Sequence, residues 1–433
     1  MEDNFYYNQK NNRPFRVVVA HPGRQHSFEL ATALEQKGVL YKYITTVYDK
    51  EKSLTSFVKK FLRGKDLKKA NGRRCKSIDD SKVIQLCEGW GLLFLLIQRI
   101  LKSQALANRF CRFYNSVFSK KVGQYLSRED IDAIIMFDST AEEAFAILKK
   151  NRPDIFRIQD VSIATRHYMK HNFENDYGLH ELKKEFPEFW DDRVMKGYKN
   201  EIEDSQFFLV ASVMSKNSLK FCGVNEDLVS IIPYGVNHNQ FSYKPSNRDH
   251  ESSLRIIYVG QVTYRKGIHH LLNVVSRFNS SEVDVYLAGG YEEDGSLYTK
   301  YKDVNNIHFL GFVTRDELAK EYQEADVFCF PTIGEGYGLV VLEALSCGVP
   351  VISSDLAGGN DAIIEGKNGF VVKAGDDNEL EDRIRWCINH RDELANMRSF
   401  SHSTALEYTW EKYHENVARV TINAIKNYQS KEE

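Results

Sequence analysis

Residues 327–354 have the sequence VFCFPTIGEGYGLVVLEALSCGVPVISS. This stretch predicts a buried strand over residues 327–330, a glycine-rich loop, a short apolar helix from Leu339, and a further strand over residues 349–353. Gly348 stands between the helix and the last strand, a position where glycine is typical of a helix carboxyl end. A strand, a helix and a second strand in this order form the repeating unit of a parallel α/β sheet.

The same alternation runs through the chain on both sides of this stretch. In the first half, a helix is predicted at residues 28–36, and strands are predicted at residues 15–20, 131–137, 156–163, 207–211 and 229–233. In the second half, further strands are predicted at residues 255–259, 283–288 and 307–310. Strands that alternate with helices predict two doubly wound α/β domains, which we place at residues 1–235 and 236–405.

Two further segments complete this domain organisation. Residues 241–253 are polar and rich in turn-forming residues, as expected of a connection between domains. Residues from Glu379 to about Asn427 have helical periodicity throughout, which predicts more helix than the second domain needs. We therefore expect residues 406–433 to form a helix that returns to the first domain.

The composition is that of an ordinary globular protein. The 433 residues are 42% hydrophobic and 27% charged, and 58 basic side chains nearly balance 60 acidic ones, so no nucleic-acid partner is indicated. The seven cysteines show no Cys-x-x-Cys spacing, which favours reduced thiols and the cytoplasm. The sequence also shows neither a signal peptide nor an apolar run near the ~20 residues that cross a bilayer.

The loop at residues 332–338 is the strongest candidate for a ligand site. In doubly wound domains ligands bind at the carboxyl ends of the strands, and this loop follows such an end. Its glycines allow close approach of the backbone, and the start of the following helix suits a diphosphate. Glu335 precedes the helix, and Glu343, eight residues on, lies inside it, where a carboxylate needs hydroxyl groups or a cation. A ligand that offers a sugar to each glutamate and a diphosphate to the helix start is a nucleotide sugar. The alternative interpretation of the two glutamates is a helix cap and a surface carboxylate.

Two other loops are expected at the same ligand edge. Arg265 and Lys266 follow the first strand of the second domain and would neutralise a leaving diphosphate, unless they belong to a solvated turn. Residues 21–25 follow the first strand of the first domain and are expected to face the other loops across a cleft. Gly23 in this loop allows either close approach of a ligand or a plain turn.

The spacing of Glu335 and Glu343 fits the Glu-x7-Glu signature of retaining glycosyltransferases, and their surroundings resemble glycosyltransferase family 4. Residues 232–237 followed by Phe241, residues 260–267, and the segments at 348–352 and 368–370 are also similar to this family. The resemblance covers residues 205–375 well, the first strand and loop moderately, and residues 40–130 hardly at all. It implies a GT-B fold, in which two Rossmann-like domains face each other across a cleft.

The resemblance also implies roles for individual residues. The donor should lie in the second domain and the acceptor mostly against the first, with neither a metal ion nor a cofactor. Arg265 and Lys266 should bind the diphosphate, Glu343 the ribose and Glu335 the transferred sugar. The expected donor contacts also include Gly23, Gly260, Phe312 and Val313 near the base, Gly336, Tyr337, Gly338 and Leu339. Gln261 stands where many members carry arginine, so Arg265 would supply more of the positive charge that binds the diphosphate.

A histidine of the first domain touches the donor sugar in this family. His167 is the candidate here, with His21 and His171 as competitors, and a structural histidine is the alternative for His167.

Residues 51–125 break the α/β pattern. Between Glu51 and Lys121 there are 17 Lys or Arg against 5 Asp or Glu, a local charge near +12. The apolar run at residues 90–97, flanked by Arg99 and Lys102, predicts a helix that binds an anionic inner-membrane surface or packs internally. No nucleic-acid module accompanies this basic insertion.

The pair Asp130 and Asp132 resembles an Asp-x-Asp metal site in spacing alone. It precedes a predicted strand at the amino end, away from the ligand edge, so a solvated turn is expected and no metal site is predicted.

These observations predict a metal-independent, retaining hexosyl- or related glycosyltransferase in polysaccharide or glycoconjugate assembly. It would move a sugar from a UDP- or GDP-sugar to a hydroxyl of a glycan or lipid-linked acceptor, in the cytoplasm and peripherally at the membrane. The alternatives are a nucleotide-sugar epimerase, a phosphorylase, and a silent subunit that binds a sugar nucleotide.

Overall fold

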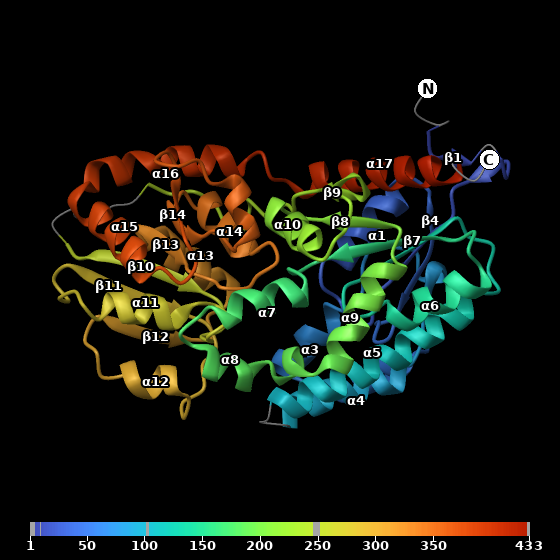
Figure 1. Ribbon diagram of the computed structural model, residues 1–433, viewed down its shortest axis with the longest axis horizontal. Helices are drawn as coiled ribbons and strands as arrows, with labels where there is room; N and C mark the ends of the chain where they lie inside the picture. Colours follow the sequence, from blue (N-terminus) through green and yellow to red (C-terminus); the bar gives the residue numbers. More distant parts are fainter. Residues whose placement is uncertain (1–4, 9, 101–103, 246–251, 431–433) are drawn as a thin grey trace.

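The structure, a computed structural model, describes residues 5–8, 10–100, 104–245 and 252–430. It consists of two α/β lobes that lie side by side (Figure 1). Residues 246–251 of the predicted connection and Lys102 beside the apolar run lie outside the described residues.

The first lobe is built on a parallel sheet of seven strands, with a small hairpin of β1 (Tyr7–Asn8) and β2 (Arg13–Pro14) before it. Its strands are β3 (Val17–Ala20), β4 (Leu40–Thr45), β5 (Val83–Gln85), β6 (Ala133–Phe137), β7 (Phe156–Val161), β8 (Phe207–Val210) and β9 (Val229–Ile231). Its helices are α1 (Ser27–Gln36), α2 (Leu54–Lys59), α3 (Gly64–Asn71), α4 (Glu88–Ile100), α5 (Gln104–Leu126), α6 (Glu142–Asn151), α7 (Arg166–Glu174), α8 (Leu179–Glu185), α9 (Asp192–Asp204) and α10 (Val213–Phe221).

The second lobe is built on a parallel sheet of six strands. These are β10 (Leu254–Val259), β11 (Val283–Ala288), β12 (Ile307–Gly311), β13 (Val327–Phe330), β14 (Val351–Ser354) and β15 (Gly369–Val372). Its helices are α11 (Ile268–Val275), α12 (Ser296–Tyr301), α13 (Arg315–Glu324), α14 (Leu339–Ser346), α15 (Asp377–Asn389) and α16 (Arg391–Ala405), and the chain ends with α17 (Trp410–Gln429).

Both sheets are doubly wound, as predicted. The strand order is β5-β4-β3-β6-β7-β8-β9 in the first lobe and β12-β11-β10-β13-β14-β15 in the second. In each sheet the first strand is central and the chain winds outward from it in both directions, so a crevice forms where the order reverses. All residues of β3, β6, β10 and β13 are buried, because helices cover both faces of a parallel sheet.

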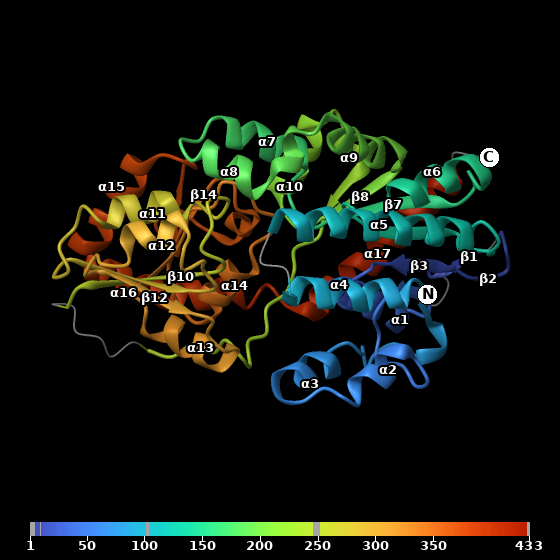
Figure 2. The same ribbon diagram turned by 90° about the horizontal axis from the view of Figure 1, so that it is seen from below.

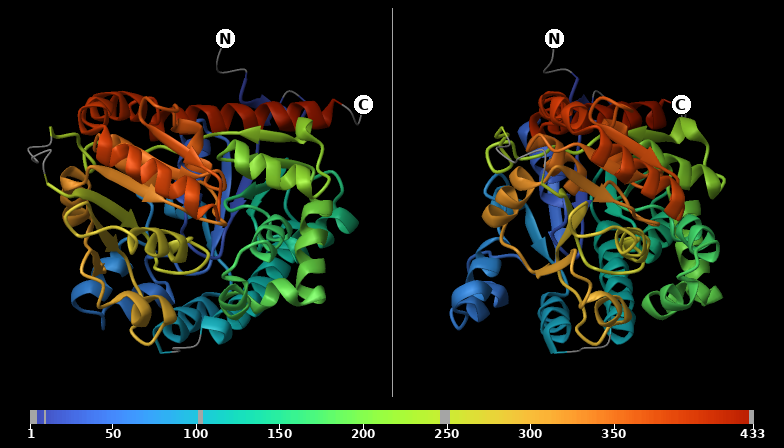
Figure 3. Two further views of the ribbon diagram at one scale, coloured as in Figure 1. Left: turned by 60° about the vertical axis from the view of Figure 1, so that its left-hand side comes forward. Right: turned by 90° about the vertical axis from the view of Figure 1, so that its left-hand side faces the viewer.

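The segment from Glu379 to about Asn427 is almost entirely helical, and it forms three helices. The breaks fall at His390 and at residues 406–409 between α16 and α17. The last helix, α17, packs along α1 of the first lobe (Figures 1 and 3). His414 on α17 lies 2.9 Å from Glu29 of α1, and the Tyr428 hydroxyl donates to the Pro153 carbonyl.

The prediction of a solvated turn at Asp130 and Asp132 is only half right. Asp130 is exposed, but Asp132 is buried and accepts hydrogen bonds from Asn8 and Arg13. The pair therefore anchors the N-terminal hairpin to the amino end of β6.

Two parts of the first lobe lie outside its sheet. The first part is the helices α2 to α5 of the basic insertion, with α4 and α5 side by side and α2 and α3 projecting beside them (Figures 2 and 3). The insertion also contributes β5, an edge strand of the sheet, so it breaks the α/β pattern only in part. Residues 166–190, which we call the bridging segment, contain α7 and α8 and reach the second lobe (Figure 1). Each part supplies residues that line the cleft between the lobes, such as Phe94 of α4 and Arg166 of α7.

Candidate active site

A cleft of about 890 Å³ lies between the lobes, at the carboxyl ends of both sheets. Of the predicted site residues, the cleft is lined by Gly23, Gly260, Lys266, Glu335, Tyr337, Gly338 and Leu339. His21 and Arg24, from the loop after β3, line it from the first lobe. The cleft thus joins the three loops that the sequence placed at the ligand edge.

The glycine-rich loop at residues 331–338 connects β13 to α14 and touches the first lobe directly. Gly336 forms an antiparallel bridge with Ile163, and the Ala164 amide donates to the Glu335 carbonyl at 3.1 Å. A β-carbon at Gly336 would lie 1.9 Å from the Ser162 carbonyl oxygen, so only glycine permits this approach. The structure therefore shows the two lobes closed on each other at this loop.

Glu335 is the charged centre of the cleft. One of its oxygens pairs with the Lys266 ammonium and lies 3.6 Å from the Arg265 guanidinium, and the other accepts from the Gly336 amide at 2.9 Å. Burial alone would raise the pKa of Glu335, but the charges of Lys266 and Arg265 lower it to about 2. Burial lowers the pKa of Lys266 despite its partner. Two cations thus share one ionised carboxylate.

The loop that carries these cations is held against the glycine-rich loop. Gly267 adopts φ +68°, and a β-carbon there would lie 1.7 Å from the Pro331 carbonyl oxygen. The Arg265 guanidinium donates to the Gly334 carbonyl at 2.7 Å. This packing fixes both cations beside Glu335, although Arg265 itself is not among the residues lining the cleft.

Glu185, on the bridging segment, supports this loop from the other lobe. Its carboxylate accepts hydrogen bonds from the backbone amides of Tyr264 at 2.9 Å and Arg265 at 3.4 Å, and burial raises its pKa. The sequence analysis missed this residue, because a contact across 79 residues leaves no periodic signal.

Glu343 lies on α14, about one turn beyond Leu339, which lines the cleft. Burial raises its pKa to about 7, against the opposing effects of Arg315 and Tyr322. The structure places Phe312 and Val313 in the loop after β12, with the Phe312 side chain 79% exposed. None of these residues is among those lining the cleft.

The histidines differ in position. His21 lines the cleft, its Nδ1 accepts from the Gly23 amide at 2.8 Å, and burial lowers its pKa to about 4. His167 is absent from the cleft lining, and its Nδ1 is buried without a hydrogen-bond partner among the described residues. His171 is exposed and packs on Phe221. The structure thus brings His21, rather than His167, to the cleft.

Three further cleft-lining residues were not predicted. His26 lies 3.0 Å from Asp160, and Arg166 donates to Asp138 at 3.1 Å. Asp138 follows β6 directly, so the rule that ligands lie at carboxyl strand ends could have found it. Arg166 and His26 depend on how the helices pack.

A group with metal-ligating side chains lies outside the cleft. Asp176 of the bridging segment and His269 and His270 of α11 place ligand atoms within 4.8 Å of one another. Each imidazole Nε2 lies 2.7–2.8 Å from a different oxygen of Asp176, a hydrogen-bond distance, and Asp377 holds the other nitrogen of His270 at 2.6 Å. This buried cluster therefore acts as a polar tie between the lobes.

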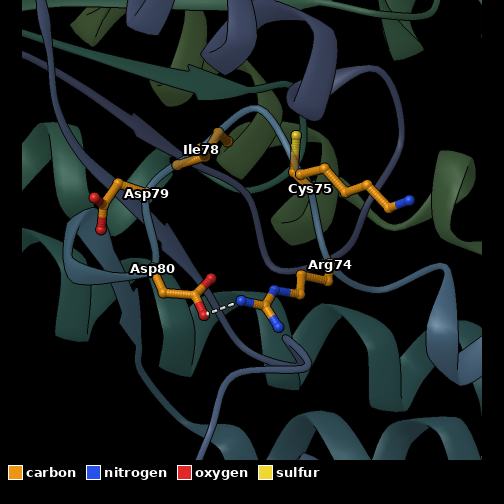
Figure 4. A pocket seen from close by; sticks show the side chains of 6 residues that line it. Arg74, Cys75, Ile78, Asp79 and Asp80 are labelled. Atoms are coloured by element: carbon orange, nitrogen blue, oxygen red, sulfur yellow. Dashed lines mark hydrogen bonds and ion pairs between the residues drawn. The ribbon is translucent and has the colours of Figure 1, made fainter.

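A second hollow lies in the basic insertion, between residues 74 and 80 (Figure 4). Arg74 on its rim donates to Asp80 at 2.7 Å, so its charge is compensated within the hollow. None of the predicted donor-binding residues lines it.

Comparison with known proteins agrees with this geometry. Residues 239–403 match the family described as glycosyl transferases group 1. The chain is 29% identical over 249 residues to an uncharacterized glycosyltransferase of Methanocaldococcus jannaschii, covering 53% of this chain and 62% of that protein. It is 29% identical over 206 residues to a sulfoquinovosyl transferase of Arabidopsis thaliana, covering 47% and 39%. The chain thus spans less than two thirds of the length of these relatives.

Solved structures extend the likeness to nearly the whole chain. A sucrose-phosphate synthase from Thermosynechococcus elongatus superposes with TM-score 0.63 at 16% identity, covering 95% of this chain and all of that one. Anabaena HepE in complex with UDP superposes with TM-score 0.58 at 15% identity, covering 94% and 99%. Likeness at such identities shows the fold. The protein therefore has the GT-B fold, and the match of its second lobe to group 1 supports a place among the GT-B glycosyltransferases.

Proposed function

We propose that this protein is a glycosyltransferase of family 4, which transfers a sugar from a nucleoside diphosphate sugar to a hydroxyl group. The observation that carries the proposal is the paired Lys266 and Glu335 beside the start of α14, inside a closed interlobe cleft. An anion site and a hydrogen-bonding carboxylate in one cleft match the two chemical parts of such a donor.

The diphosphate would lie between Lys266 and the first turn of α14. Arg265, Lys266 and Glu335 together carry one net positive charge, and the amides at the start of α14 add partial positive charge. A diphosphate would compete with Glu335 for Lys266 and free the carboxylate to accept hydrogen bonds from sugar hydroxyls. Glu343, raised in pKa by burial, would be compensated by the hydroxyls of the ribose.

The same groups would stabilise the transition state. As the bond to the sugar breaks, negative charge develops on the leaving diphosphate, where Lys266, Arg265 and the α14 amides are already oriented. The two cations would take the role of a divalent ion, and the acceptor would attack on the leaving-group side, with retention of the anomeric configuration. UDP- and GDP-sugars are the proposed donors.

The first lobe would hold a glycan or lipid-linked acceptor at a membrane surface. Phe57 and Phe61 of the basic insertion are 56% and 69% exposed, and α4 exposes Trp90, Leu93 and Leu96 along one face. Exposed apolar side chains among basic ones suit an anionic lipid surface. Within the described residues no helix is both long and apolar enough to cross a bilayer. We propose peripheral attachment on the cytoplasmic side, in polysaccharide or glycoconjugate assembly; the seven free cysteines support that compartment.

A nucleotide-sugar screen tests the donor half of this proposal. Thermal-shift measurements with UDP- and GDP-sugars should identify a stabilising donor, and acceptor trials with that donor should then release nucleoside diphosphate. NMR of the product should show the anomeric configuration of the donor. Lys266→Ala at saturating acceptor should lose turnover. Release of nucleotide without any acceptor, or binding without turnover, would favour the epimerase or the silent subunit.

Vesicle flotation tests the membrane half. The wild-type protein should float with vesicles containing phosphatidylglycerol and stay behind with pure phosphatidylcholine, whereas the double variant Phe57→Ser and Phe61→Ser should stay behind with both. Equal flotation of the wild type and the double variant would contradict the attachment.

A further inference from the structure

Two arginines on the first-lobe wall of the cleft have no acidic partner among the described residues. Arg24 belongs to the loop after β3, Arg73 follows α3, and both line the cleft. Across the part of the chain that the structure describes, neither guanidinium forms an ion pair, whereas the adjacent Arg74 pairs with Asp80 (Figure 4). These two cations are therefore available to a ligand in the cleft.

The two guanidinium groups lie close enough to repel each other. The Arg24 Nη1 atom is 3.0 Å from the position that a β-carbon would occupy at Gly72, the chain neighbour of Arg73. Burial lowers the pKa of Arg73, and the nearby charge of Arg24 lowers it further. Two like charges in a partly buried position are unfavourable unless an anion compensates them.

The wall beside these arginines is apolar and firmly held. Gly91, Phe94 and Leu95 of α4 line the cleft together with Tyr114 of α5. A β-carbon at Gly91 would lie 2.5 Å from the Thr46 hydroxyl, so α4 packs closely on the loop after β4. The buried Tyr114 hydroxyl lies 2.5 Å from that of Thr46.

The same helix connects the cleft to the molecular surface. The residues of α4 that line the cleft are Gly91, Phe94, Leu95 and Gln98, which share one helical face. Of the exposed apolar residues of α4, Trp90 lies one turn before Phe94, whereas Leu93 and Leu96 lie on the opposite side of the helix. An apolar chain that enters the cleft past Trp90 would contact Phe94 and Leu95 beside the arginine pair.

We propose that Arg24 and Arg73 form an anion subsite for a phosphate or diphosphate ester of the acceptor. The proposal rests on the proposed function and adds the chemical class of the acceptor: its phosphate lies against the first lobe, across the cleft from Lys266. Bidentate donation by guanidinium groups suits phosphate oxygens. The phosphate belongs either to a lipid carrier, whose chain would contact Phe94 and Leu95, or to a phosphorylated sugar without a chain.

Equilibrium binding of three probes tests the subsite. With the donor site saturated by the nucleoside diphosphate that binds best, farnesyl diphosphate, farnesol and inorganic pyrophosphate are titrated calorimetrically. We expect farnesyl diphosphate to bind at least tenfold more tightly than farnesol. Arg24→Gln and Arg73→Gln should each weaken the binding of farnesyl diphosphate at least tenfold and leave the affinity for farnesol unchanged. The affinity of Arg74→Gln for farnesyl diphosphate should stay within twofold of that of the wild type.

The outcomes separate the subsite from the proposed function. Equal affinity for farnesyl diphosphate and farnesol, or unchanged binding in Arg24→Gln and Arg73→Gln, overturns the subsite even where the nucleotide binds normally. Absence of nucleoside diphosphate binding to the wild type overturns the donor assignment instead. If pyrophosphate binds as tightly as farnesyl diphosphate, the result supports the subsite and assigns it to an acceptor without a lipid chain. If pyrophosphate binds more weakly than farnesyl diphosphate, the result supports a lipid carrier.

Discussion

Replacing Lys266 by methionine keeps most of the side-chain volume and removes the charge that faces Glu335. The pKa of Glu335 is about 2, against an ordinary value of 4.5, because Lys266 and Arg265 outweigh burial, so the folded environment as a whole stabilises the ionised carboxylate by about 3 kcal/mol. This stabilisation is present above pH 4.5 and is lost as the pH falls toward 2. At pH 7 we expect K266M to lower the free energy of unfolding by up to that amount, and the difference should shrink below pH 4.5.

The same substitution should weaken the donor site. A hydrogen bond to a charged group contributes about 1.5–3 kcal/mol, so the nucleoside diphosphate should bind about tenfold to a hundredfold more weakly to K266M. Turnover should fall by roughly a further hundredfold if Lys266 also stabilises the leaving diphosphate. Calorimetry with the nucleoside diphosphate and a nucleotide-release assay measure the two effects.

A matched control distinguishes the role of Lys266 in the cleft from the effect of removing any lysine that pairs with a glutamate. Lys412 pairs with Glu407 at 2.6 Å on the surface, where its side chain is 53% exposed. K412M should bind nucleotide and turn over as the wild type does. If K266M behaved like K412M in nucleotide affinity and turnover, Lys266 would have no part in donor binding and the reasoning would be refuted.

Three further predictions concern other parts of the site. Because burial raises the pKa of Glu343 to about 7, the folded protein loses stability as the pH rises from 4.5 through 7; Glu343→Gln should raise the Tm at pH 8 by a few degrees and weaken nucleotide binding about tenfold, and a lower Tm would contradict this. Gly336→Val would place side-chain atoms against the Ser162 carbonyl oxygen, so turnover should drop at least tenfold and hydrogen exchange at the Ala164 amide should accelerate; unchanged exchange would show that this loop does not need glycine. Burial alone would lower the pKa of His270, but Asp176 and Asp377 raise it to about 9, so the protonated imidazole stabilises the folded protein. This stabilisation is complete below pH 6.5 and is lost as the pH rises through 9. The Tm should therefore fall between pH 7 and 9.5 in the wild type and much less in Asp176→Asn, whereas parallel plots of Tm against pH would contradict the role of this cluster as a tie between the lobes.

The sequence predicted the buried strands well and the marginal ones poorly. Strands such as β6 and β13 are continuous apolar runs because both faces of a parallel sheet are covered. The edge strand β5 has three residues, of which only Val83 is fully buried, and β4 carries the partly exposed Tyr41 and Lys42. Such strands are defined by their neighbours in the sheet, so their own sequence gives a weak signal.

The candidate site could likewise be predicted only in part. Lys266 and Glu335 could be placed together because each follows a strand of the same sheet, and carboxyl strand ends meet at one edge. The bridging segment could not be predicted: Asp176 meets His269 across 93 residues, and nothing in the local pattern of either indicates the other. The contacts between lobes therefore depend on tertiary packing.

A crystal structure of the protein with the nucleoside diphosphate selected by the thermal-shift screen tests the central claim most directly. We expect the β-phosphate in the cleft, about 3 Å from the Lys266 ammonium and from the Leu339 amide at the start of α14, with Glu335 turned toward the sugar position. A nucleotide bound elsewhere, with Lys266 still paired to Glu335, would contradict the account.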